Sequence, residues 1–520
     1  MSELETILDI VAFVIVFLGA TPLLSALLQF LLVGFHRFRK LYEKALPENA
    51  PRGRAWPYLP RTAILIPAWN EAAVLAASVE RLVALEYPPD RLRVVVVDDA
   101  STDETPQVMA RLQERHPGRV LHLRRENGGQ GKAHTLNHGL REVLADDWAE
   151  AVLIMDADVI YDRDALWRMT RHLARPEVGA VTAYIKEGSG REGTYLNRYI
   201  AFEYIAAQAA ARRTQNVLGV VACLAGGAQL HSRENLLALG GQIDTTTLAE
   251  DTVTTFETQL GGRRVIFDGA ATVRAEEPGG IAGLWKQRLR WARGNLQITH
   301  RYRSLWFRGR LAGRHHRLGS WTFGVAWFSL LLTPLLMVLC SLSLLFLYFV
   351  GHYERAWSAF HLLWVINLVS YLFIVLVSLA IDPETARRCW REALVFPGIV
   401  AVLIMVIAAV PRVFEPLLAR WGLGLGPESA HPLVVFFYIW LLLCLPLAWL
   451  AKVVAGRRRL RWLAPVLVHL TGYGSLLAAC SVAAFFLELR GAEMRWDKTE
   501  KTGKAGKVTA ADGDGEREVR

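Results

Sequence analysis

The sequence predicts two connected parts: a doubly wound α/β domain with a mostly parallel sheet, and an α-helical membrane domain of about six spans. Between about residues 60 and 280, short apolar runs rich in β-branched residues alternate with helical patterns. Such runs are typical of strands buried on both faces of a parallel sheet. The start and the last third of the chain hold longer apolar runs, and a helix of about 20 apolar residues crosses a bilayer.

The first expected element is a retained membrane helix at 8–35. This run is nearly free of charge, is too long for the apolar core of a signal peptide and lacks a clear small-residue cleavage site. The first C-terminal run is long enough to contain a surface helix as well as a span. The C-terminal spans are expected near 322–350, 358–381, 393–411, 432–452 and 463–488.

Basic loops predict the orientation of these spans. Segments 385–392 and 452–462 are rich in arginine whereas 351–357 is not, and short basic loops face the cytoplasm. The large soluble segment 41–318 would lie on the same side, in a multi-pass protein of the plasma (inner) membrane. These loops also explain the net charge of +10, so no nucleic acid is expected as a partner. The five cysteines are scattered, without the spacing of a zinc site.

Composition suggests where the domains begin and end. The last segment is polar and of low complexity, so we expect it to be disordered. The expected domains are an N-terminal membrane helix (1–40), a linker (41–60), the soluble α/β domain (61–280), amphipathic helices at the membrane surface (281–318), a C-terminal membrane bundle (319–490) and the disordered tail (491–520).

Within the soluble domain, three buried strands are expected at 62–71, 93–102 and 151–159, with helices at 72–85 and 132–144. A single acidic turn after a strand is often only a helix N-cap. Three strand ends together favour a binding crevice, because ligands of open α/β sheets bind at the carboxyl ends of the strands. The polar residues at these ends are Asn70 and Glu71, Asp98 and Asp99, and Asp156 and Asp158.

Two common nucleotide sites are excluded. No GxGxxG follows the first strand, so a dinucleotide site is not expected. The segment "ENGGQGKAH" (126–134) resembles a phosphate-binding loop, but Glu126 and Ala133 replace the glycine and the hydroxyl residue that such a loop requires.

The pair Asp156-x-Asp158 is a candidate metal site. On an extended strand, residues i and i+2 point the same way. Two carboxylates there can hold Mg²⁺ or Mn²⁺ together with a diphosphate, although an isolated DxD often occurs by chance.

Two other motifs have an ordinary and a functional interpretation. Glu250 and Asp251 begin a helical pattern, where acids suit the helix dipole, or Asp251 is a general base that removes a proton from a sugar hydroxyl. Gly226 and Gly227 form a turn, or allow the backbone to approach a ligand closely.

The segment "LWKQRLRWARG" (284–294) resembles the basic, aromatic collar of a membrane protein. However, Gln287, Arg290 and Trp291 have the spacing of one helix face. A guanidinium can hold a diphosphate through paired hydrogen bonds, and an indole offers a flat face to a sugar ring. Lys286, Arg293 and later arginines such as Arg301 and Arg308 are expected to face anionic headgroups instead.

In order and spacing, Asp99, Asp156-x-Asp158, Glu250-Asp251 and 287–291 resemble the motifs of membrane-embedded family 2 glycosyltransferases. These include cellulose, chitin, hyaluronan and poly-β-1,6-N-acetylglucosamine synthases. The resemblance covers about residues 60–300 and implies a GT-A fold with a Rossmann-like, mostly parallel sheet. It also implies inverting, metal-dependent transfer from a UDP-sugar by a cytoplasmic catalytic domain. UDP-N-acetylglucosamine is the expected donor, because segment 284–294 is most similar to the poly-N-acetylglucosamine synthases.

The resemblance also implies a role for each motif. Asp251 would be the base, with Glu250 beside it, and Mg²⁺ or Mn²⁺ would bind Asp158 and Asp156. The nucleotide sugar would contact Pro67, Asn70, Glu71, Asp99, Lys132, Asp156 and Arg290, and the acceptor would lie by Gly226, Gly227, Gln287 and Trp291.

Three functions remain open at this point. The first is a processive polysaccharide synthase that translocates its product, which the numerous C-terminal spans favour. The second is a lipid glycosyltransferase that adds one sugar, similar to ceramide glucosyltransferases. The third is a sensor or transporter that only binds nucleotide sugar and would not need Asp251. Relatives usually have Thr before the Glu-Asp pair or Arg shortly after it; Ala249 and Thr252 stand here, which leaves the sugar open. Expected partners are the UDP-sugar, a glycan or lipid acceptor, membrane lipids and a small accessory membrane subunit, which some poly-N-acetylglucosamine systems use.

Overall fold

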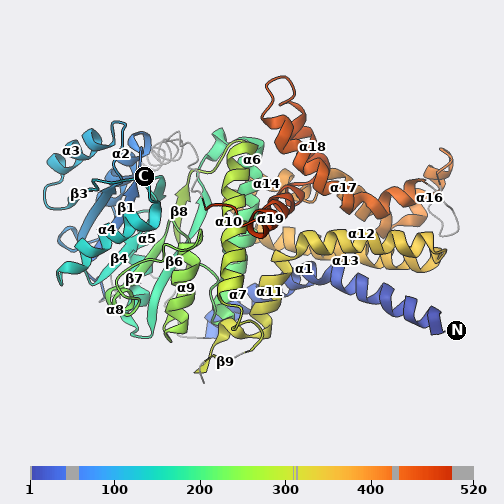
Figure 1. Ribbon diagram of the computed structural model, residues 1–520, viewed down its shortest axis with the longest axis horizontal. Helices are drawn as coiled ribbons and strands as arrows, with labels where there is room; N and C mark the ends of the chain where they lie inside the picture. Colours follow the sequence, from blue (N-terminus) through green and yellow to red (C-terminus); the bar gives the residue numbers. More distant parts are fainter. Residues whose placement is uncertain (1–2, 43–57, 309, 312–313, 424–431, 495–520) are drawn as a thin grey trace. The chain divides into compact units, whose positions relative to one another are not determined.

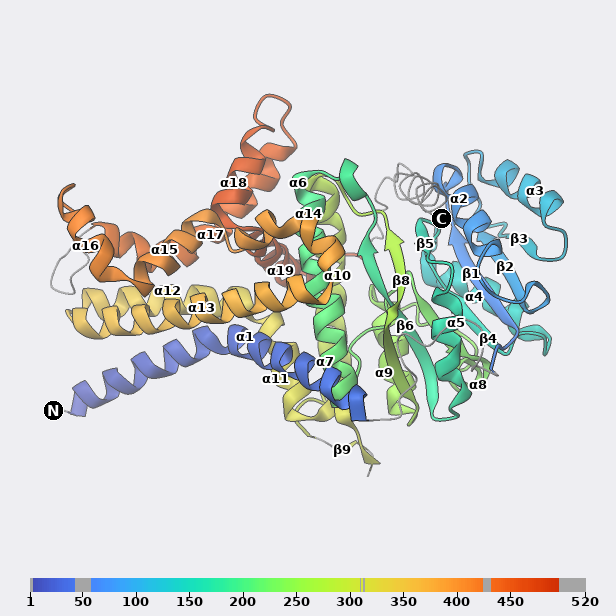
Figure 2. The same ribbon diagram turned by 180° about the vertical axis from the view of Figure 1, so that it is seen from behind.

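A computed structural model describes residues 3–42, 58–308, 310–311, 314–423 and 432–494 (Figures 1 and 2). The chain divides into two compact units. The helical unit contains Met1–Leu31, Gly280–Leu296 and Gly324–Glu493, and the α/β unit contains Leu32–Gly279, Gln297–Phe323 and Met494–Arg520. Residues 43–57 of the expected linker (41–60) and residues 495–520 of the expected tail (491–520) lie outside the described residues.

The first half of the α/β unit alternates strands and helices, as predicted. Its three expected strands and two expected helices all form. The prediction missed α3 and β3, and only the first residue of β3 is buried. The elements are β1 (Thr62–Ala68), α2 (Ala72–Val83), β2 (Leu92–Asp98), α3 (Thr105–Arg115), β3 (Val120–Arg124), α4 (Lys132–Ala145) and β4 (Ala151–Ile154).

The sheet has eight strands in the order β3-β2-β1-β4-β7-β6-β8-β5. Strands β3, β2, β1 and β4 are parallel, so their carboxyl ends meet at one edge. β7 (Gln229–Ser232) is antiparallel to both β4 and β6 (Val178–Glu187). β8 (Arg264–Ala275) is parallel to β6, and β5 (Val159–Tyr161) is antiparallel to β8. The sheet is therefore mixed, with a parallel first half.

The second half of the α/β unit supplies the remaining helices. They are α5 (Ala165–Thr170), α6 (Tyr195–Tyr204), a π-helical segment (Ile205–Ala210), α7 (Ala211–Leu218), α8 (Arg233–Ala238) and α9 (Glu250–Leu260).

Helices cover the parallel half of the sheet because its strands are apolar on both faces. Leu65 and Val97 pack against Leu136 and Leu140 of α4 in one buried cluster. Ile64, which precedes Leu65, is also fully buried and by strand alternation points to the opposite face. The two-sided burial predicted for these strands is confirmed.

The prediction that Asp156 and Asp158 share one face of an extended strand was wrong. β4 ends at Ile154, and Asp158 lies in the turn before β5. The chain must reverse here, because β5 pairs with β8 at the far edge of the sheet rather than continuing β4.

The helical unit accounts for the expected spans with both straight and bent helices. Among the described residues, three helices are long and apolar enough to cross a membrane: Glu3–Gly34, Tyr353–Ile381 and Leu433–Ala455. Three helix pairs are bent by 70°, 75° and 96°, so the count reaches six only if each pair is one span. These pairs are α11 (Trp321–Leu331) with α12 (Thr333–Phe349), α14 (Pro383–Leu394) with α15 (Ile399–Ala409), and α18 (Leu463–Thr471) with α19 (Tyr473–Leu489).

The three breaks lie within the expected spans 322–350, 393–411 and 463–488. Proline and glycine residues at these positions explain why the helices end there. Pro334 lies in the first turn of α12. Gly398 and Gly472 adopt positive φ angles of 99° and 92° at the starts of α15 and α19. A Cβ on Gly472 would lie 2.3 Å from the Pro397 carbonyl carbon, so these two breaks pack backbone against backbone.

The remaining helices are α1 (Glu3–Tyr42), α10 (Ile281–Arg301), α13 (Tyr353–Ile381), α16 (Pro411–Ala419) and α17 (Pro432–Ala455). The basic segment 385–392, expected as a loop, lies within α14.

Segment 281–318, expected to form several amphipathic helices, contains one long helix, α10. After α10 come turns, the short strands β9 (Arg310–Leu311) and β10 (Arg314–His315), and a 3-10 turn at Arg317–Gly319. Two arginines expected at the lipid surface have protein partners instead. Arg293 is buried, 2.5 Å from Glu488 Oε1, and Arg301 lies 3.0 Å from Asp244 Oδ1.

Candidate active site

Lys132 lies in the middle of a cluster of carboxylates. Its Nζ is 2.5 Å from Asp156 Oδ1 and 3.6 Å from Glu250 Oε1, and it donates to the Gly226 carbonyl oxygen at 3.4 Å. Burial would lower the pKa of Lys132, but the carboxylates of Asp156, Glu250 and Asp251 outweigh it and hold this pKa above its ordinary value. Lys132 therefore stays protonated and brings together residues from four separate segments.

Gly226 lies against the same charged groups. A Cβ at this position would be 3.3 Å from Lys132 Nζ, 3.4 Å from Asp251 Oδ2 and 3.9 Å from Asp156 Oδ2. At Gly227 a Cβ would meet Val159 Cγ2 at 2.8 Å. The glycine pair therefore permits a close approach of backbone to the cluster, whereas its approach to a ligand is untested. Its contact with an acceptor stays a prediction.

The loop that carries these glycines is anchored by hydroxyl groups. Leu224 N donates to Thr255 Oγ1 of α9 at 2.8 Å, and Tyr161 OH donates to the Gly227 carbonyl at 3.0 Å. Burial raises the pKa of Tyr161 well above its ordinary value, and Asp156 raises it further, so the phenol remains a donor.

Asp251 is oriented by the start of α9. Its Oδ1 accepts from Thr252 N at 2.7 Å, while Oδ2 lies on the Gly226 side of the carboxylate. Two acids in the first turn also suit the positive end of the helix dipole. One oxygen is thus held by the protein and the other lies beside the cluster, an orientation suited to proton abstraction.

Asp99 is buried at the carboxyl end of β2 and is held from the side of the glycine-rich segment. Gly129 N donates to its Oδ2 at 2.9 Å, and Arg125 forms an ion pair with Oδ1. A Cβ on Gly128 would lie 2.2 Å from the Asp99 carbonyl oxygen, so this loop needs glycine to reach the strand end. The segment that resembles a phosphate-binding loop therefore packs on Asp99.

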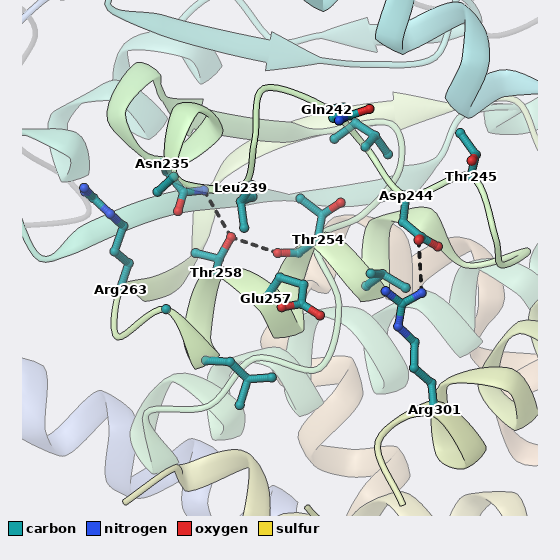
Figure 3. Close-up of a pocket in the computed structure, with 15 residues that line it drawn as sticks. Asn235, Leu239, Gln242, Asp244, Thr245, Thr254, Glu257, Thr258, Arg263 and Arg301 are labelled. Carbon is teal, nitrogen blue, oxygen red and sulfur yellow. Dashed lines mark hydrogen bonds and ion pairs between the residues drawn. The ribbon is translucent and has the colours of Figure 1, made fainter. Parts of the chain in front are cut away.

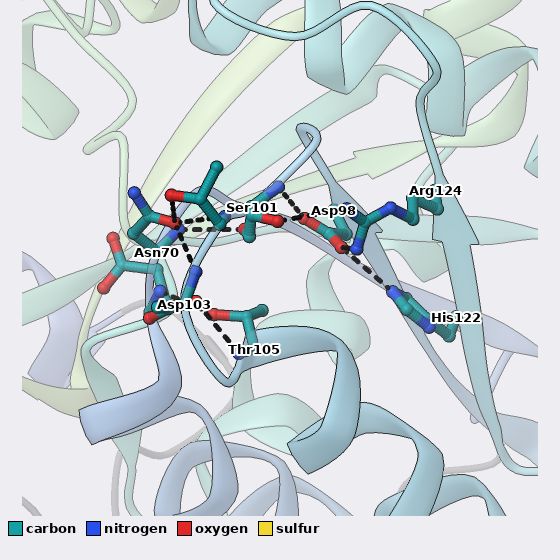
Figure 4. A network of polar contacts seen from close by, with 9 residues as sticks. Asn70, Asp98, Ser101, Asp103, Thr105, His122 and Arg124 are labelled. Atoms are coloured by element: carbon teal, nitrogen blue, oxygen red, sulfur yellow. Dashed lines mark hydrogen bonds and ion pairs between the residues drawn. The ribbon is translucent and has the colours of Figure 1, made fainter.

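A polar network supports the loop after β2 (Figure 4). Asp98 accepts from Ser101 N and Arg124 Nη1, each at 2.8 Å, and lies 3.5 Å from His122 Nε2. Burial raises the pKa of Asp98, but the bonds from His122 and Ser101 and the charge of Arg124 outweigh it and hold the pKa below its ordinary value. Asp98 thus joins the loop after β2 to β3 through Ser101 and Arg124.

Asn70 holds the other side of this loop. Its φ of 54° is in the left-handed region, and its Oδ1 accepts from Thr102 N at 2.8 Å and Asp103 N at 3.2 Å. Glu71 N donates to Thr105 Oγ1 at 2.9 Å, while Pro67 lies in β1. The structure therefore brings Pro67, Asn70 and Glu71 to the strand edge that holds Asp99, and their contact with uridine stays a prediction.

Asp156 and Asp158 are the residues predicted to hold Mg²⁺ or Mn²⁺. Within the described residues, no group of three or more His, Cys, Asp or Glu side chains could hold a metal ion. Asp156 and Asp158 are close in sequence and offer hard oxygen donors. Mg²⁺ is commonly held by one or two carboxylates while substrate phosphates and water complete its shell. The donor set fits a metal that binds together with a diphosphate.

Gln287, Arg290 and Trp291 lie on α10 at the predicted helical spacing. The neighbouring Arg288 is buried, donates to Gln287 Oε1 at 3.2 Å and stacks on the Trp291 ring at 4.0 Å. These residues belong to the helical unit, and their roles in substrate binding stay predictions.

Sequence reasoning missed Arg125 and Tyr161, which contact Asp99 and Gly227. Arg125 immediately follows β3, the strand that was not predicted. Recognition of that strand would have placed Arg125 at the carboxyl edge of the parallel sheet. Tyr161 could not be found in this way, because β5 reaches the site only through its pairing with β8.

Several known proteins resemble this chain in sequence or in fold. Residues 60–294 match the family model described as glycosyltransferase like family 2. They therefore form a glycosyltransferase family 2 domain, which covers slightly less than half of the chain.

Several curated proteins are similar in sequence. The probable glycosyltransferase YdaM of Bacillus subtilis is 30% identical over 282 residues, which are 54% of this chain and 65% of that protein. The beta-monoglucosyldiacylglycerol synthase of Synechocystis is 31% identical over 268 residues, 51% of this chain and 54% of the relative. The poly-beta-1,6-N-acetyl-D-glucosamine synthase of Staphylococcus aureus is 27% identical over 238 residues, 46% and 55% of the two chains. This chain thus spans about half to two thirds of its relatives' length.

Solved structures with a similar fold include a mannosyltransferase. The mannosyltransferase PcManGT from Pyrobaculum calidifontis aligns with a TM-score of 0.51 and 22% identity, over 78% of this chain and 99% of that chain. The mixed sheet with its parallel first half is therefore GT-A-like, and the predicted fold class is confirmed.

Proposed function

Starting from a glycosyltransferase family 2 domain at residues 60–294, we propose that this chain is a membrane-bound enzyme that transfers a sugar, with inversion, from a UDP-sugar to a growing polysaccharide. The observation that carries the proposal is the convergence of Lys132, Asp156, Glu250 and Asp251 around Gly226. A module that only bound nucleotide would not need a carboxylate oriented with its second oxygen toward the Gly226 loop.

The proposed reaction needs one base and no enzyme nucleophile. Asp251 accepts the proton of the acceptor hydroxyl as its oxygen attacks the anomeric carbon. The new glycosidic bond forms as the bond between that carbon and the diphosphate breaks, so UDP leaves and the configuration inverts. Lys132 keeps Asp156 and Glu250 from repelling one another and the incoming diphosphate.

Asp156 and Asp158 are the proposed ligands of Mg²⁺ or Mn²⁺, which would neutralise charge on the leaving diphosphate. The similar mannosyltransferase structure is a complex with GDP-Man and Mn²⁺. Arg290 as a second diphosphate contact, and Gln287 and Trp291 as acceptor contacts, rest on the resemblance of segment 287–291.

The acceptor has two candidates. The poly-N-acetylglucosamine synthase relative supports a polysaccharide and UDP-N-acetylglucosamine, with translocation through the membrane unit. The glucosyldiacylglycerol synthase relative supports transfer of one sugar to a lipid instead. The helical unit favours neither acceptor strongly, since its described residues hold three helices long enough to cross a membrane and three bent pairs. The polysaccharide remains our first proposal, with the catalytic domain in the cytoplasm at the plasma membrane and an accessory subunit as partner.

Transfer assays can separate these acceptors. The purified full chain in lipid vesicles is incubated with several labelled UDP-sugars, with and without EDTA, and the product is sized. Metal-dependent glycan of high molecular weight supports the polysaccharide, and label confined to an organic extract supports the lipid. Absence of transfer with every donor contradicts the proposed enzyme.

The base is tested by Asp251→Asn, which keeps the shape and removes the proton acceptor. We expect transfer to fall by about 10³-fold or more while UDP binds with unchanged affinity, since general bases typically contribute 10²–10⁴-fold. Normal turnover in this variant would remove Asp251 from the role of base.

A further inference from the structure

The loop at 243–249 leads into α9 and therefore into Glu250 and Asp251. The residue that precedes α9, Ala249, makes no side-chain cap hydrogen bond, and its methyl group cannot make one. The start of the catalytic helix therefore depends on what holds the loop before it.

The beginning of the loop is held by α4. Asn137 Nδ2 donates to the Ile243 carbonyl at 2.9 Å, and Asn137 Oδ1 accepts from Ile243 N at 2.7 Å. This paired contact fixes one end of the loop, seven residues before α9 begins.

The other end of the loop is held by Gln297. Its Oε1 accepts from Leu248 N at 2.9 Å. Leu248 precedes Glu250 by two residues and Asp251 by three, so this bond holds the loop just before the start of α9. Gln297 lies within α10, the helix that also carries the 287–291 motif.

Two neighbours of Gln297 reinforce the contact. Arg301 Nη1 lies 3.0 Å from Asp244 Oδ1, and Tyr302 OH donates to Glu257 Oε1 of α9 at 2.6 Å. The Asp244–Arg301 pair is visible in Figure 3, with Glu257 nearby. Arg301 Nη1 also donates to Thr246 Oγ1 at 2.9 Å, so segment 297–302 contacts the loop at three residues and α9 at one.

Packing alone does not hold the loop on this side. An open groove of about 650 Å³ lies between loop residues 242–245 and α9 (Figure 3). Thr254, Glu257 and Thr258 of α9 line one side of it. Because the groove is not filled by side chains, the loop has room to move when its hydrogen bonds are lost.

We propose that Gln297 is a positioning residue for sugar transfer: through the Leu248 N–H it fixes the start of α9 and hence the Asp251 carboxylate. Arg301 and Tyr302 support the same position. The inference rests on the proposed function, because it assigns Gln297 a role in catalysis only if Asp251 acts as the base.

The test compares Gln297→Leu, which removes the acceptor, with Gln297→Glu, which keeps a carboxylate oxygen for the Leu248 N–H. We expect Gln297→Leu to lower kcat by about tenfold while KM for the UDP-sugar changes by less than about twofold. Gln297→Glu should keep kcat within about twofold of the parent protein. His300→Leu is the matched control, because the His300 side chain is exposed on the same helix and its backbone bond to Arg303 N is kept in the variant.

Amide hydrogen exchange of segment 244–251 in the purified full chain gives a readout that needs no activity. Exchange should be faster in Gln297→Leu and unchanged in Gln297→Glu and His300→Leu. If the parent protein transfers no sugar, the proposed function fails, and the exchange data alone decide whether Gln297 holds the loop. Unchanged exchange in Gln297→Leu overturns the inference, as does normal kcat in this variant or equal impairment of Gln297→Glu.

Discussion

Gly226→Ala tests the charged cluster without removing any of its charges. The φ angle of Gly226 is outside the left-handed region, so alanine fits the backbone. Its new methyl carbon would lie 3.3 Å from Lys132 Nζ and 3.4 Å from Asp251 Oδ2. Both separations are tighter than usual for a Cβ, so the neighbouring groups must give way by a few tenths of an ångström.

The size of the effect follows from this displacement. A misplacement of 1 Å in a catalytic site can cost about 10²-fold in rate, so a shift of a few tenths should cost about tenfold. That loss corresponds to about 1.4 kcal/mol of transition-state stabilisation. The methyl group also occupies space beside the base, which adds to the loss. We therefore expect kcat to fall by about 10- to 30-fold.

The assay is the initial rate of transfer at saturating UDP-sugar, with UDP affinity and the thermal midpoint measured in parallel. Affinity and midpoint should change little, because no buried bond is broken. Gly280→Ala is the control, since a Cβ there meets no atom within 4 Å and its φ is also outside the left-handed region. A kcat for Gly226→Ala within about twofold of the parent protein, or an equal loss in Gly280→Ala, would refute the placement of Gly226 beside the base.

Three further predictions concern charge. Lys132→Met leaves Asp156 and Glu250 without their cation, so sugar transfer should fall at least about 10²-fold. The free energy of unfolding should fall by about 2 kcal/mol. This loss is smaller than for a fully buried ion pair, because the Asp156 side chain is 40% exposed. Unchanged activity would show that this cation is dispensable. Burial lowers the pKa of His231 from 6.5 to about 4, so an unfolded chain binds a proton that the folded chain excludes between these values. Stability should therefore fall by up to roughly 3 kcal/mol as pH drops through this window. His231→Asn keeps an acceptor for Asn235 and should weaken the pH dependence of stability measured by thermal unfolding. An unchanged pH dependence in this variant would contradict its assignment to His231. Arg293→Gln breaks the buried contact with Glu488 and should lower the thermal midpoint by several degrees. Arg308→Ala is the control, because Arg308 is exposed and its loss should leave the midpoint unchanged. Equal midpoints for the two variants would contradict a stabilising role for the Arg293–Glu488 ion pair.

Much of the α/β unit could be predicted because its signals are local. β1, β2 and β4 are apolar on both faces, and their burial follows from that pattern alone. The parallel pairing of these strands then placed Asp99 and Asp156 at one edge. The candidate residues Lys132, Gly226 and Asp251 were named from motifs, but no local pattern indicated that Lys132 would contact Asp156 and Glu250 at once.

Other features depend on contacts between distant segments. The breaks at Gly398 and Gly472 interrupt runs whose hydropathy is continuous, so composition could not distinguish a bent pair from one span. Arg293 belongs to a basic segment that composition assigns to lipid, yet its partner Glu488 lies almost 200 residues later in the chain. Whether an arginine faces lipid or a carboxylate is decided by which helices pack together.

The sequence by itself determined the strand-helix alternation, the apolar helices and the identity of the acidic motifs, because each is a property of neighbouring residues. Only the tertiary structure decided that Asp158 lies in a turn, that Arg125 binds Asp99, and that Gln297 holds the loop before Asp251. Each of these depends on strand pairing or on a hydrogen bond between residues far apart in the chain, and no periodicity in the sequence encodes such a distance.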